Sequence, residues 1–154
     1  MFLPFGLAER KGYKMNTYDG SINDVTNFKT YKYLKINSAG FQNAPRGYTV
    51  IRKKGRLDYH ILLITSGSCN VLHNDKTYKL TAGNLVIYAP QEEQKYSFTA
   101  NSTTMWCHFT GTVSDEIMTD AKLESGIYFL KPNMLGERIL LPWAACVNKK
   151  IKNY

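Results

Sequence analysis

The sequence predicts a mainly β protein, built as a small antiparallel barrel or sandwich. In residues 56–90, RLDYHILLITSGSCNVLHNDKTYKLTAGNLVIYAP, short strand-like runs are separated by Gly67, Asn74-Asp75 and Gly83. Evenly spaced short strands with turn residues between them are typical of barrels and sandwiches. Aromatic residues make up 13% of the chain, which suits strands, and 154 residues suit one domain with a buried core. A barrel of this size can enclose one small ligand.

Residues 1–27 are expected to form an irregular N-terminal arm, and residues 28–130 to form the barrel. The first strand is expected at residues 28–36, FKTYKYLKI, because its side chains alternate along the chain. Residues 37–46 are rich in Asn, Gly and Pro. This composition predicts a loop.

Two strands are expected next, at residues 48–52 and 57–65. The first, YTVIR, is rich in β-branched residues, and Lys53-Lys54-Gly55 turns the chain toward the second. The second is a continuous apolar run, which is typical of a strand that is buried rather than exposed.

A β-hairpin is expected between residues 70–73 and 77–80. Asn74-Asp75-Lys76 separates these two runs, and Asn and Asp tolerate the left-handed backbone that a tight hairpin turn requires. Further strands are expected at residues 85–88, 96–98, 105–109 and 127–130.

One short helix is expected toward the C-terminal end of the barrel. Ser114 is the expected N-cap, and Asp115 and Glu116 in the first turn interact favourably with the helix dipole. The helix should stop near Gly126. Residues 131–154 are expected to form an irregular tail, because prolines and a glycine interrupt them.

The charge of the chain raises the possibility of a nucleic-acid partner. Twenty Lys and Arg residues against 12 Asp and Glu residues give a formal net charge of +8, which fits an acidic partner. The basic residues are scattered, however, and no helix-turn-helix, zinc-finger or RNA-binding signature accompanies them. A basic nucleic-acid-binding barrel is therefore the weakest functional alternative.

The cysteines and the apolar runs indicate the compartment. Cys69, Cys107 and Cys146 are odd in number and contain no C-x-x-C pair, so neither a disulfide framework nor a zinc cluster is expected. No apolar run approaches the length of a membrane span, and the N-terminal residues lack the pattern of a secretory signal. These features predict a cytoplasmic protein with no membrane partner.

Four segments of the chain together resemble a known family. In order, they are GYTVIRKKGRLDYHILLITSG, KTYKLTAGNLVIYAP, EEQKYSF and MWCHFTG. Over about residues 34–117 the chain resembles the N-terminal, cupin-type effector-sensing domain of AraC-family transcriptional regulators. The resemblance implies a cupin-like jelly-roll barrel that binds a small molecule, often a sugar, and passes its occupancy to a DNA-binding unit.

Members of this family usually continue with a dimerising helical segment and two helix-turn-helix motifs. The chain ends too soon for either, so it is expected to be a fragment, a separated sensor domain or a shortened gene product. DNA is then a partner only through a helix-turn-helix domain that is missing from this chain. Residues after about Gly126 do not resemble the family's linker helices, so homodimer formation is left open.

The resemblance also raises the question of a metal, because other cupins are enzymes. A metal-loaded cupin presents a His-x-His pair with a following Glu, and a later His completes the ligands. This chain has only His60 on the first of these strands, with Ser66 where the Glu and Gln94 where the later His would stand. One imidazole cannot hold a metal ion, so neither a metal nor a cofactor is expected.

The resemblance implies that Arg52 and Tyr96 bind the ligand. A guanidinium suits the recognition of hydroxyl or carboxylate groups, and Tyr96 follows a turn from which its hydroxyl can reach the barrel mouth. Trp106 offers a flat apolar platform for a sugar ring. From the residues alone, an exposed charge for Arg52 and core packing for Trp106 remain as alternatives.

Four further residues complete the candidate ligand site. Thr104 and His108 lie two residues on either side of Trp106, so strand alternation puts all three on one face. His60 belongs to the apolar strand, whose pocket-lining face the sequence leaves undetermined. Ser38 stands at a contact position of the family.

The expected function is binding without turnover, and no catalytic residue is assigned. A polar small molecule, with a sugar as the expected class, would stack on Trp106 and hydrogen-bond Arg52, Tyr96 and His108. The leading alternative is a cupin enzyme that works without a metal, such as a sugar epimerase or isomerase, with His60 or His108 as the base.

Overall fold

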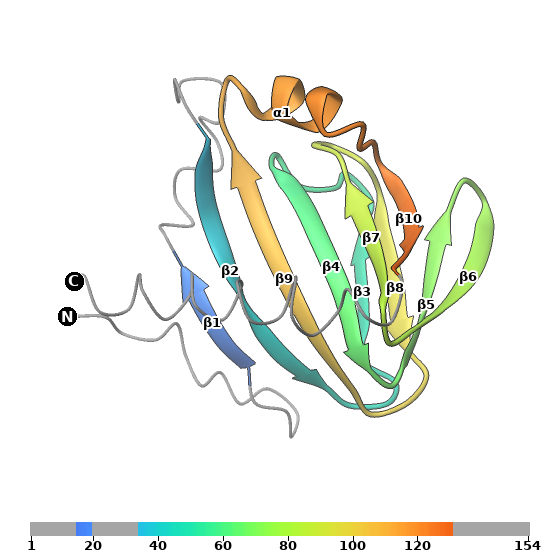
Figure 1. Cartoon of the computed structure of the whole chain (residues 1–154). Coiled ribbons are helices and arrows are strands. Elements are labelled where there is room, and N and C mark those ends of the chain that lie inside the picture. The colour runs from blue at the N-terminus through green and yellow to red at the C-terminus, as the bar shows by residue number, and fades with distance from the viewer. Residues whose placement is uncertain (1–14, 20–33, 131–154) are drawn as a thin grey trace.

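The computed structural model describes residues 15–19 and 34–130. In chain order, its elements are β1 (Met15–Asp19), β2 (Lys35–Ala44), β3 (Thr49–Arg52), β4 (Tyr59–Ser66), β5 (Ser68–His73), β6 (Lys76–Thr81), β7 (Asn84–Tyr88), β8 (Gln94–Phe98), β9 (Ser102–Thr110), α1 (Ser114–Asp120) and β10 (Gly126–Phe129). The strands form a six-stranded sheet in the order β1-β2-β9-β4-β7-β10 and a four-stranded sheet in the order β3-β8-β5-β6 (Figure 1). Neighbouring strands run antiparallel in both sheets.

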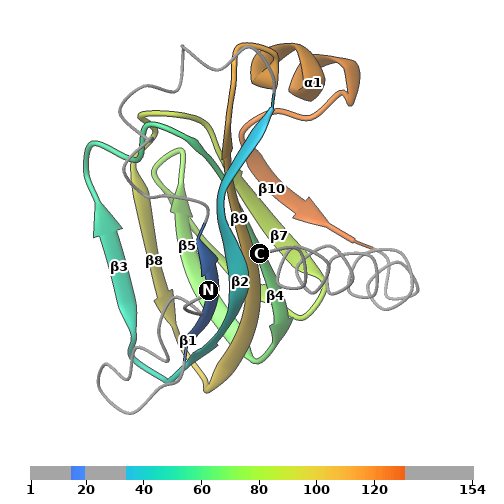
Figure 2. The same cartoon turned by 90° about the vertical axis from the view of Figure 1, so that its left-hand side faces the viewer.

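The two sheets lie face to face and enclose one core between them (Figure 2). Leu62 and Trp106 of the six-stranded sheet belong to the same buried cluster as Val71 and Phe98 of the four-stranded sheet. Side chains alternate between the two faces of a strand, so every second residue of these strands points into the barrel. The predicted fold class, a mainly β cupin-like jelly roll with a short helix, is confirmed.

Part of the outer face of the six-stranded sheet is also buried. Ala39, Ile87, Cys107 and Phe109 form a second cluster there, and Met118 of α1 packs into it. β9 is therefore covered on both faces, with Trp106 toward the barrel interior and Cys107 on the opposite side. This explains why residues 105–109 contain so few charged or small polar side chains.

The hairpin of β5 and β6 forms as predicted, across Asn74 and Asp75. His73 is paired with Lys76, so the turn has two central residues. Both adopt the left-handed backbone, with φ of 49° for Asn74 and 60° for Asp75. This is the geometry that a two-residue hairpin turn requires.

The prediction of a loop at residues 37–46 is wrong, because most of this segment is strand β2. β2 pairs with β9 from Lys35 to Ala44, with a register shift between Ile36 and Ser38. The polar residues of β2 misled the prediction because a polar barrel interior accepts them. Gln42, for example, is buried and lies opposite Thr104.

The start and the end of the helix also differ from prediction. Val113, not Ser114, is the N-cap residue, and Ser114 is the first helical residue. The Ser114 hydroxyl donates a hydrogen bond to the carbonyl oxygen of Gly111. The helix ends at Asp120, before the expected stop near Gly126, which instead begins β10.

Several predictions fall partly or wholly outside the described residues. They include most of the N-terminal arm, the start of the strand expected at residues 28–36, and the tail at residues 131–154 with Cys146. Within the expected arm, Met15–Asp19 forms β1 and pairs with β2. In the described part of the chain, no helix has the length and apolar character that crossing a bilayer requires.

Candidate functional site

Polar side chains gather inside the barrel at one end. They are Asn37, Arg52, Arg56, Asp58, His60, Gln94 and His108, which we call the inner polar cluster. Strand register brings its members together, because Arg52 is paired with Gln94 between β3 and β8, and His60 with His108 between β4 and β9. Residues that are directly opposite each other on neighbouring strands share one face of the sheet.

Gln94 connects the two sheets within this cluster. Its side-chain oxygen Oε1 accepts a hydrogen bond of 2.8 Å from Nη1 of Arg52, on the neighbouring strand. The same oxygen lies 3.3 Å from Nδ1 of His60, which belongs to the opposite sheet. Gln94 is fully buried, so these contacts fix the orientation of its amide.

Asp58 carries the negative charge of the cluster. Its carboxylate accepts hydrogen bonds from Arg56 Nε at 2.7 Å and Arg56 Nη2 at 3.1 Å, and from Asn37 Nδ2 at 2.9 Å. Burial of Asp58 opposes ionisation, but His108 and Arg56 outweigh it and hold the pKa of the carboxyl well below its usual range. Asp58 is therefore a buried, paired carboxylate.

The two histidines stack on each other inside the barrel. The ring centroids of His60 and His108 are 4.1 Å apart, and Nδ1 of His108 lies 3.6 Å from Oδ1 of Asp58. Burial lowers the pKa of His60 well below 6.5, and the charges of His108 and Arg52 act in the same direction. Burial likewise lowers the pKa of His108 to about 4, although Asp58 raises it.

Both imidazoles are therefore neutral at neutral pH. A neutral imidazole has one nitrogen that donates a hydrogen bond and one that accepts. The pair can thus bind a hydroxyl group of a ligand in either role.

Aromatic side chains line the barrel interior next to His60 and His108. The ring centroid of Trp106 lies 5.2 Å from that of His108, and the ring centroid of Tyr96 lies 6.4 Å from that of His60. Burial raises the pKa of Tyr96, against the opposing effect of nearby Arg52, so the phenol remains protonated. This part of the barrel interior thus combines flat apolar rings with hydroxyl and N–H groups.

The barrel interior contains many buried polar atoms without a partner. Within residues 34–130, eight such side-chain atoms are Asn37 Oδ1, Gln42 Nε2, Tyr88 Oη, Gln94 Nε2, Thr104 Oγ1, Trp106 Nε1, His108 Nδ1 and Thr110 Oγ1. By register, Gln42 lies opposite Thr104, and Tyr88 lies opposite His60. Folded proteins leave only a few such atoms per hundred residues, so a group of them marks a place where water or a polar ligand can bind.

All of the residues proposed from the sequence lie on the interior side of the barrel. Arg52, His60 and His108 belong to the inner polar cluster, and Tyr96 and Trp106 lie next to it. Two more are buried nearby on the same face, namely Ser38, opposite His108, and Thr104, opposite Gln42. The structure also answers the question left open for β4, because His60, and not Tyr59, points inward. Their role in binding remains a prediction.

Sequence reasoning missed other members of the cluster. Asp58 precedes His60 by two residues and Gln94 precedes Tyr96 by two, so strand alternation could have placed both on the inner face. Asn37 could not have been found this way, because the register shift between Ile36 and Ser38 interrupts the alternation.

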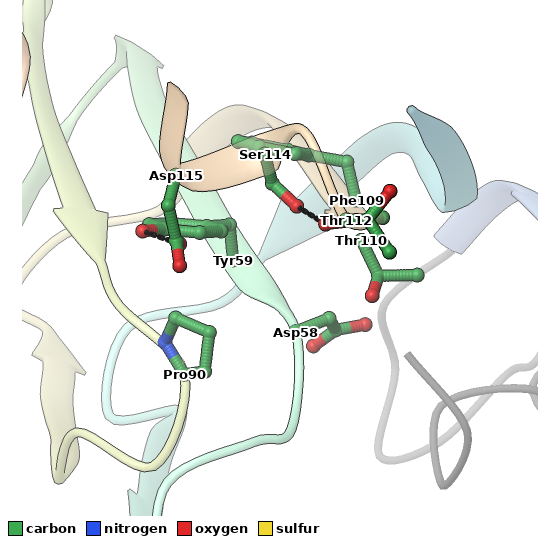
Figure 3. Close-up of a pocket in the computed structure, with 9 residues that line it drawn as sticks. Asp58, Tyr59, Pro90, Phe109, Thr110, Thr112, Ser114 and Asp115 are labelled. Carbon is green, nitrogen blue, oxygen red and sulfur yellow. Dashed lines mark hydrogen bonds between the residues drawn. The ribbon is translucent and has the colours of Figure 1, made fainter. Parts of the chain in front are cut away.

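A cavity of about 310 Å³ lies at the barrel rim, next to α1 (Figure 3). Asp58, Thr110, Pro90 and the stacked rings of Tyr59 and Phe109 line it, together with the start of α1. The Tyr59 hydroxyl donates a hydrogen bond of 2.7 Å to Asp115 in α1. Burial and this contact raise the pKa of Tyr59 to about 12.

We call this space the rim cavity. None of the residues proposed from the sequence lines it, but Asp58 belongs to both the rim cavity and the inner polar cluster. The two sites are therefore adjacent, and one buried carboxylate connects them.

Metal binding finds no support in the described part of the chain. No group of three or more His, Cys, Asp or Glu side chains is placed to hold a metal ion there. His60 and His108 face each other, but the nearest carboxylate, Asp58, is already bound by Arg56 and Asn37. The residues do not fit a metal centre of the kind found in cupins.

Comparison with known families gives a match. A family model described as the AraC-like ligand binding domain matches residues 35–147. A search of curated proteins gives no significant match.

Solved structures include distant similarities. The cupin domain of Cnp3 from Schizosaccharomyces pombe is 13% identical with a TM-score of 0.48, covering 75% of this chain and 74% of that one. The plu4264 protein from Photorhabdus luminescens is 10% identical with a TM-score of 0.47, covering 76% and 91%. An HTH_3-family transcriptional regulator from Vibrio cholerae is 10% identical with a TM-score of 0.46, covering 64% and 50%.

Proposed function

The chain belongs to the family of AraC-like ligand-binding domains, and from this premise we propose that it senses a polar small molecule held inside the barrel. Binding changes the barrel without chemical turnover of the ligand. The change is passed to a DNA-binding domain of the helix-turn-helix type.

The observation that carries this proposal is the group of unpartnered polar atoms in the barrel interior. Hydrogen-bonding atoms that are buried without a partner cost free energy, about 1–3 kcal/mol each. A polar ligand offsets this cost by satisfying several of them at once. A packed structural core would instead present apolar side chains at Thr104, His108 and Gln94, where this chain is polar and buried.

A sugar is the ligand class that we propose for this interior. The face of the Trp106 indole accepts the apolar side of a sugar ring, while Arg52, Tyr96 and His108 bind hydroxyl groups. His60, Thr104 and Ser38 lie within the same buried surface and extend the set of hydrogen-bonding partners.

The ligand reaches this interior through the rim in our proposal. The exposed fractions of Trp106 and His108 are only 9% and 6%, so side chains at the barrel end must move to admit it. Asp58 lines the rim cavity, and its carboxylate accepts a hydrogen bond from Arg56 of the inner polar cluster. Asp58 is followed in sequence by Tyr59, whose hydroxyl hydrogen-bonds Asp115 in α1. A movement of Asp58 on ligand binding would therefore also move α1, which lies at the protein surface.

Calorimetric titration of the full chain with a panel of monosaccharides tests this function. Binding of at least one sugar is expected, with affinity weakened about tenfold or more in Arg52→Ala and in Trp106→Ala, because each loses a direct contact. Ile51→Ala is the matched control, since Ile51 is next to Arg52 but is 57% exposed. Unchanged affinity in both interior variants, with normal thermal unfolding, would exclude the proposed site.

A second candidate function is a metal-independent cupin enzyme such as a sugar epimerase. It is favoured by one observation, the position of His108 Nδ1 at 3.6 Å from Asp58, because a carboxylate can orient an imidazole that acts as a base. Incubation of the sugar panel with the protein in D₂O distinguishes the two functions. The sensor proposal predicts no deuterium incorporation into the sugar, whereas exchange that disappears in His108→Gln would establish the enzyme.

A further inference from the structure

The charges of the inner polar cluster do not balance. Arg56 and Asp58 neutralise each other through two hydrogen bonds. Arg52 is half-buried, donates to the neutral amide of Gln94 and lies against the neutral phenol of Tyr96. Among residues 34–130, no ion pair joins Arg52 to a carboxylate.

The histidines do not change this balance. His60 and His108 are buried, and the charges of Arg52 and Arg56 disfavour their protonation further. With both imidazoles neutral, two guanidinium groups and one carboxylate leave the cluster with one excess positive charge. A charge in a partly buried site is stabilised by an opposite charge from a ligand.

The unpartnered atoms also favour one kind of ligand. Nε2 of Gln94, Nε1 of Trp106 and Nε2 of Gln42 are N–H groups, which can only donate hydrogen bonds. The orientation of the Gln94 amide is fixed, because its oxygen already accepts from Arg52.

Acceptors without a partner are fewer. Of the eight atoms, Oδ1 of Asn37 is the one that can only accept, while the hydroxyl groups and the His108 nitrogen can serve either role. A ligand that fits this interior must therefore offer more acceptors than donors. A carboxylate has acceptors alone, and it also carries the charge that Arg52 requires.

We propose that the ligand of this barrel is a sugar acid, a monosaccharide-sized polyol with one carboxylate, and that the carboxylate binds Arg52 and the Gln94 amide. The remaining hydroxyl groups bind the histidines and Thr104, and the ring lies on Trp106. This inference rests on the proposed sensing function and assigns the chemical class of its ligand. Arg52 is the residue that determines the preference for an acid over a neutral sugar.

Matched pairs of ligands test the inference by calorimetry in a buffer free of phosphate and carboxylates. The probes are glucuronate against glucose and galacturonate against galactose. Each acid is expected to bind at least about tenfold more tightly than its neutral partner, the magnitude of one charge-assisted interaction. Arg52→Gln is expected to abolish this preference, because a neutral amide cannot pair with the carboxylate; acid and neutral partner should then bind within about threefold of each other, whatever their absolute affinities.

Two further variants keep the result interpretable. Lys53→Gln removes the same charge from the neighbouring exposed residue, and it is expected to leave the preference intact. Arg52→Lys keeps the charge and is expected to retain part of the preference, even if Arg52→Gln is too unstable to purify.

The outcomes distinguish this inference from the proposed sensing function on which it rests. If neutral sugars bind as tightly as their acids, or if the preference persists in Arg52→Gln, the inference is overturned and the sensing function stands. If neither acids nor neutral sugars bind the wild-type protein, the sensing function is overturned as well.

Discussion

His108 shows how position within the barrel sets the chemistry of a residue. An imidazole in water has a pKa near 6.5, but burial lowers that of His108 to about 4 in spite of Asp58. His108 therefore binds a proton less readily in the folded protein than in the unfolded chain. Because the folded pKa is lowered, the associated stability is complete above pH 6.5 and is lost as the pH falls toward 4.

We expect the free energy of unfolding to fall by about 3 kcal/mol between pH 6.5 and pH 4 on account of His108, at about 1.4 kcal/mol for each pH unit of the shift. His60, whose pKa is lowered in the same direction, adds to this fall. Urea unfolding at a series of pH values measures it. His108→Gln, which cannot be protonated, is expected to reduce the fall to the part that His60 contributes.

Ile51→Ala, which replaces an exposed side chain that cannot titrate, is the control for this experiment and should leave the shape of the profile unchanged. Asp58 affects the free energy of unfolding at lower pH than the histidines do. Because its pKa is lowered, its contribution to stability is complete above pH 3.8 and is lost only at more acidic pH. A profile that is flat in the wild type between pH 6.5 and pH 4 would contradict the assignment of neutral, buried histidines.

The residues of the site differ in how far sequence could identify them. Trp106, Thr104 and His108 follow from alternation along one strand, and the structure places them on one face. Gln94 was considered only as a position where a metal-binding histidine would stand. Its role in connecting two sheets depends on a contact with His60, 34 residues away in sequence, which a local pattern cannot contain.

At the scale of single elements, turn residues predicted the structure correctly, whereas the polarity of a segment did not predict whether it forms a strand. The β5–β6 hairpin forms where Asn74-Asp75 predicted it, because the left-handed turn depends on these two residues alone. β2 was missed because its polar residues are buried in a polar interior. A strand of this kind owes its formation to pairing with β1 and β9, which the local composition does not reveal.

We expect Asp75→Gly to raise the free energy of unfolding by about 0.5–1 kcal/mol, because glycine adopts a φ of 60° without the steric cost of a Cβ. Asp75 is exposed, so no packing is lost. Urea unfolding midpoints measure the change. Asp75→Val is the opposite control and should destabilise, since a β-branched residue is strained there; a less stable Asp75→Gly would show that the turn geometry is not the controlling factor.

At the scale of the whole molecule, the two sheets share one core and should unfold together. Leu62 of β4 and Val71 of β5 belong to the same buried cluster. Removing a side chain from one sheet therefore weakens its packing against the other. Small domains with one such core unfold in a single cooperative transition.

Leu62→Ala is expected to lower the free energy of unfolding by about 2–5 kcal/mol, the usual cost of a cavity at a fully buried leucine. Ile51→Ala, at a site that is 57% exposed, should change it by less than about 0.5 kcal/mol. Far-UV and near-UV circular dichroism during urea unfolding measure both changes. Separate transitions by the two probes would show a populated intermediate and contradict unfolding in a single cooperative step.

The sequence by itself determined the mainly β class, the hairpin, the family and the shared face of Trp106 and His108, because each depends on local periodicity, on turn residues or on the order of short motifs. The tertiary structure alone decided which polar groups meet. Arg56 and Asp58 pair, Arg52 is left with neutral partners, and the histidines stack, since register brings distant strands together in a space that excludes water. Charge balance in such a space is a property of the assembled barrel and not of any one strand.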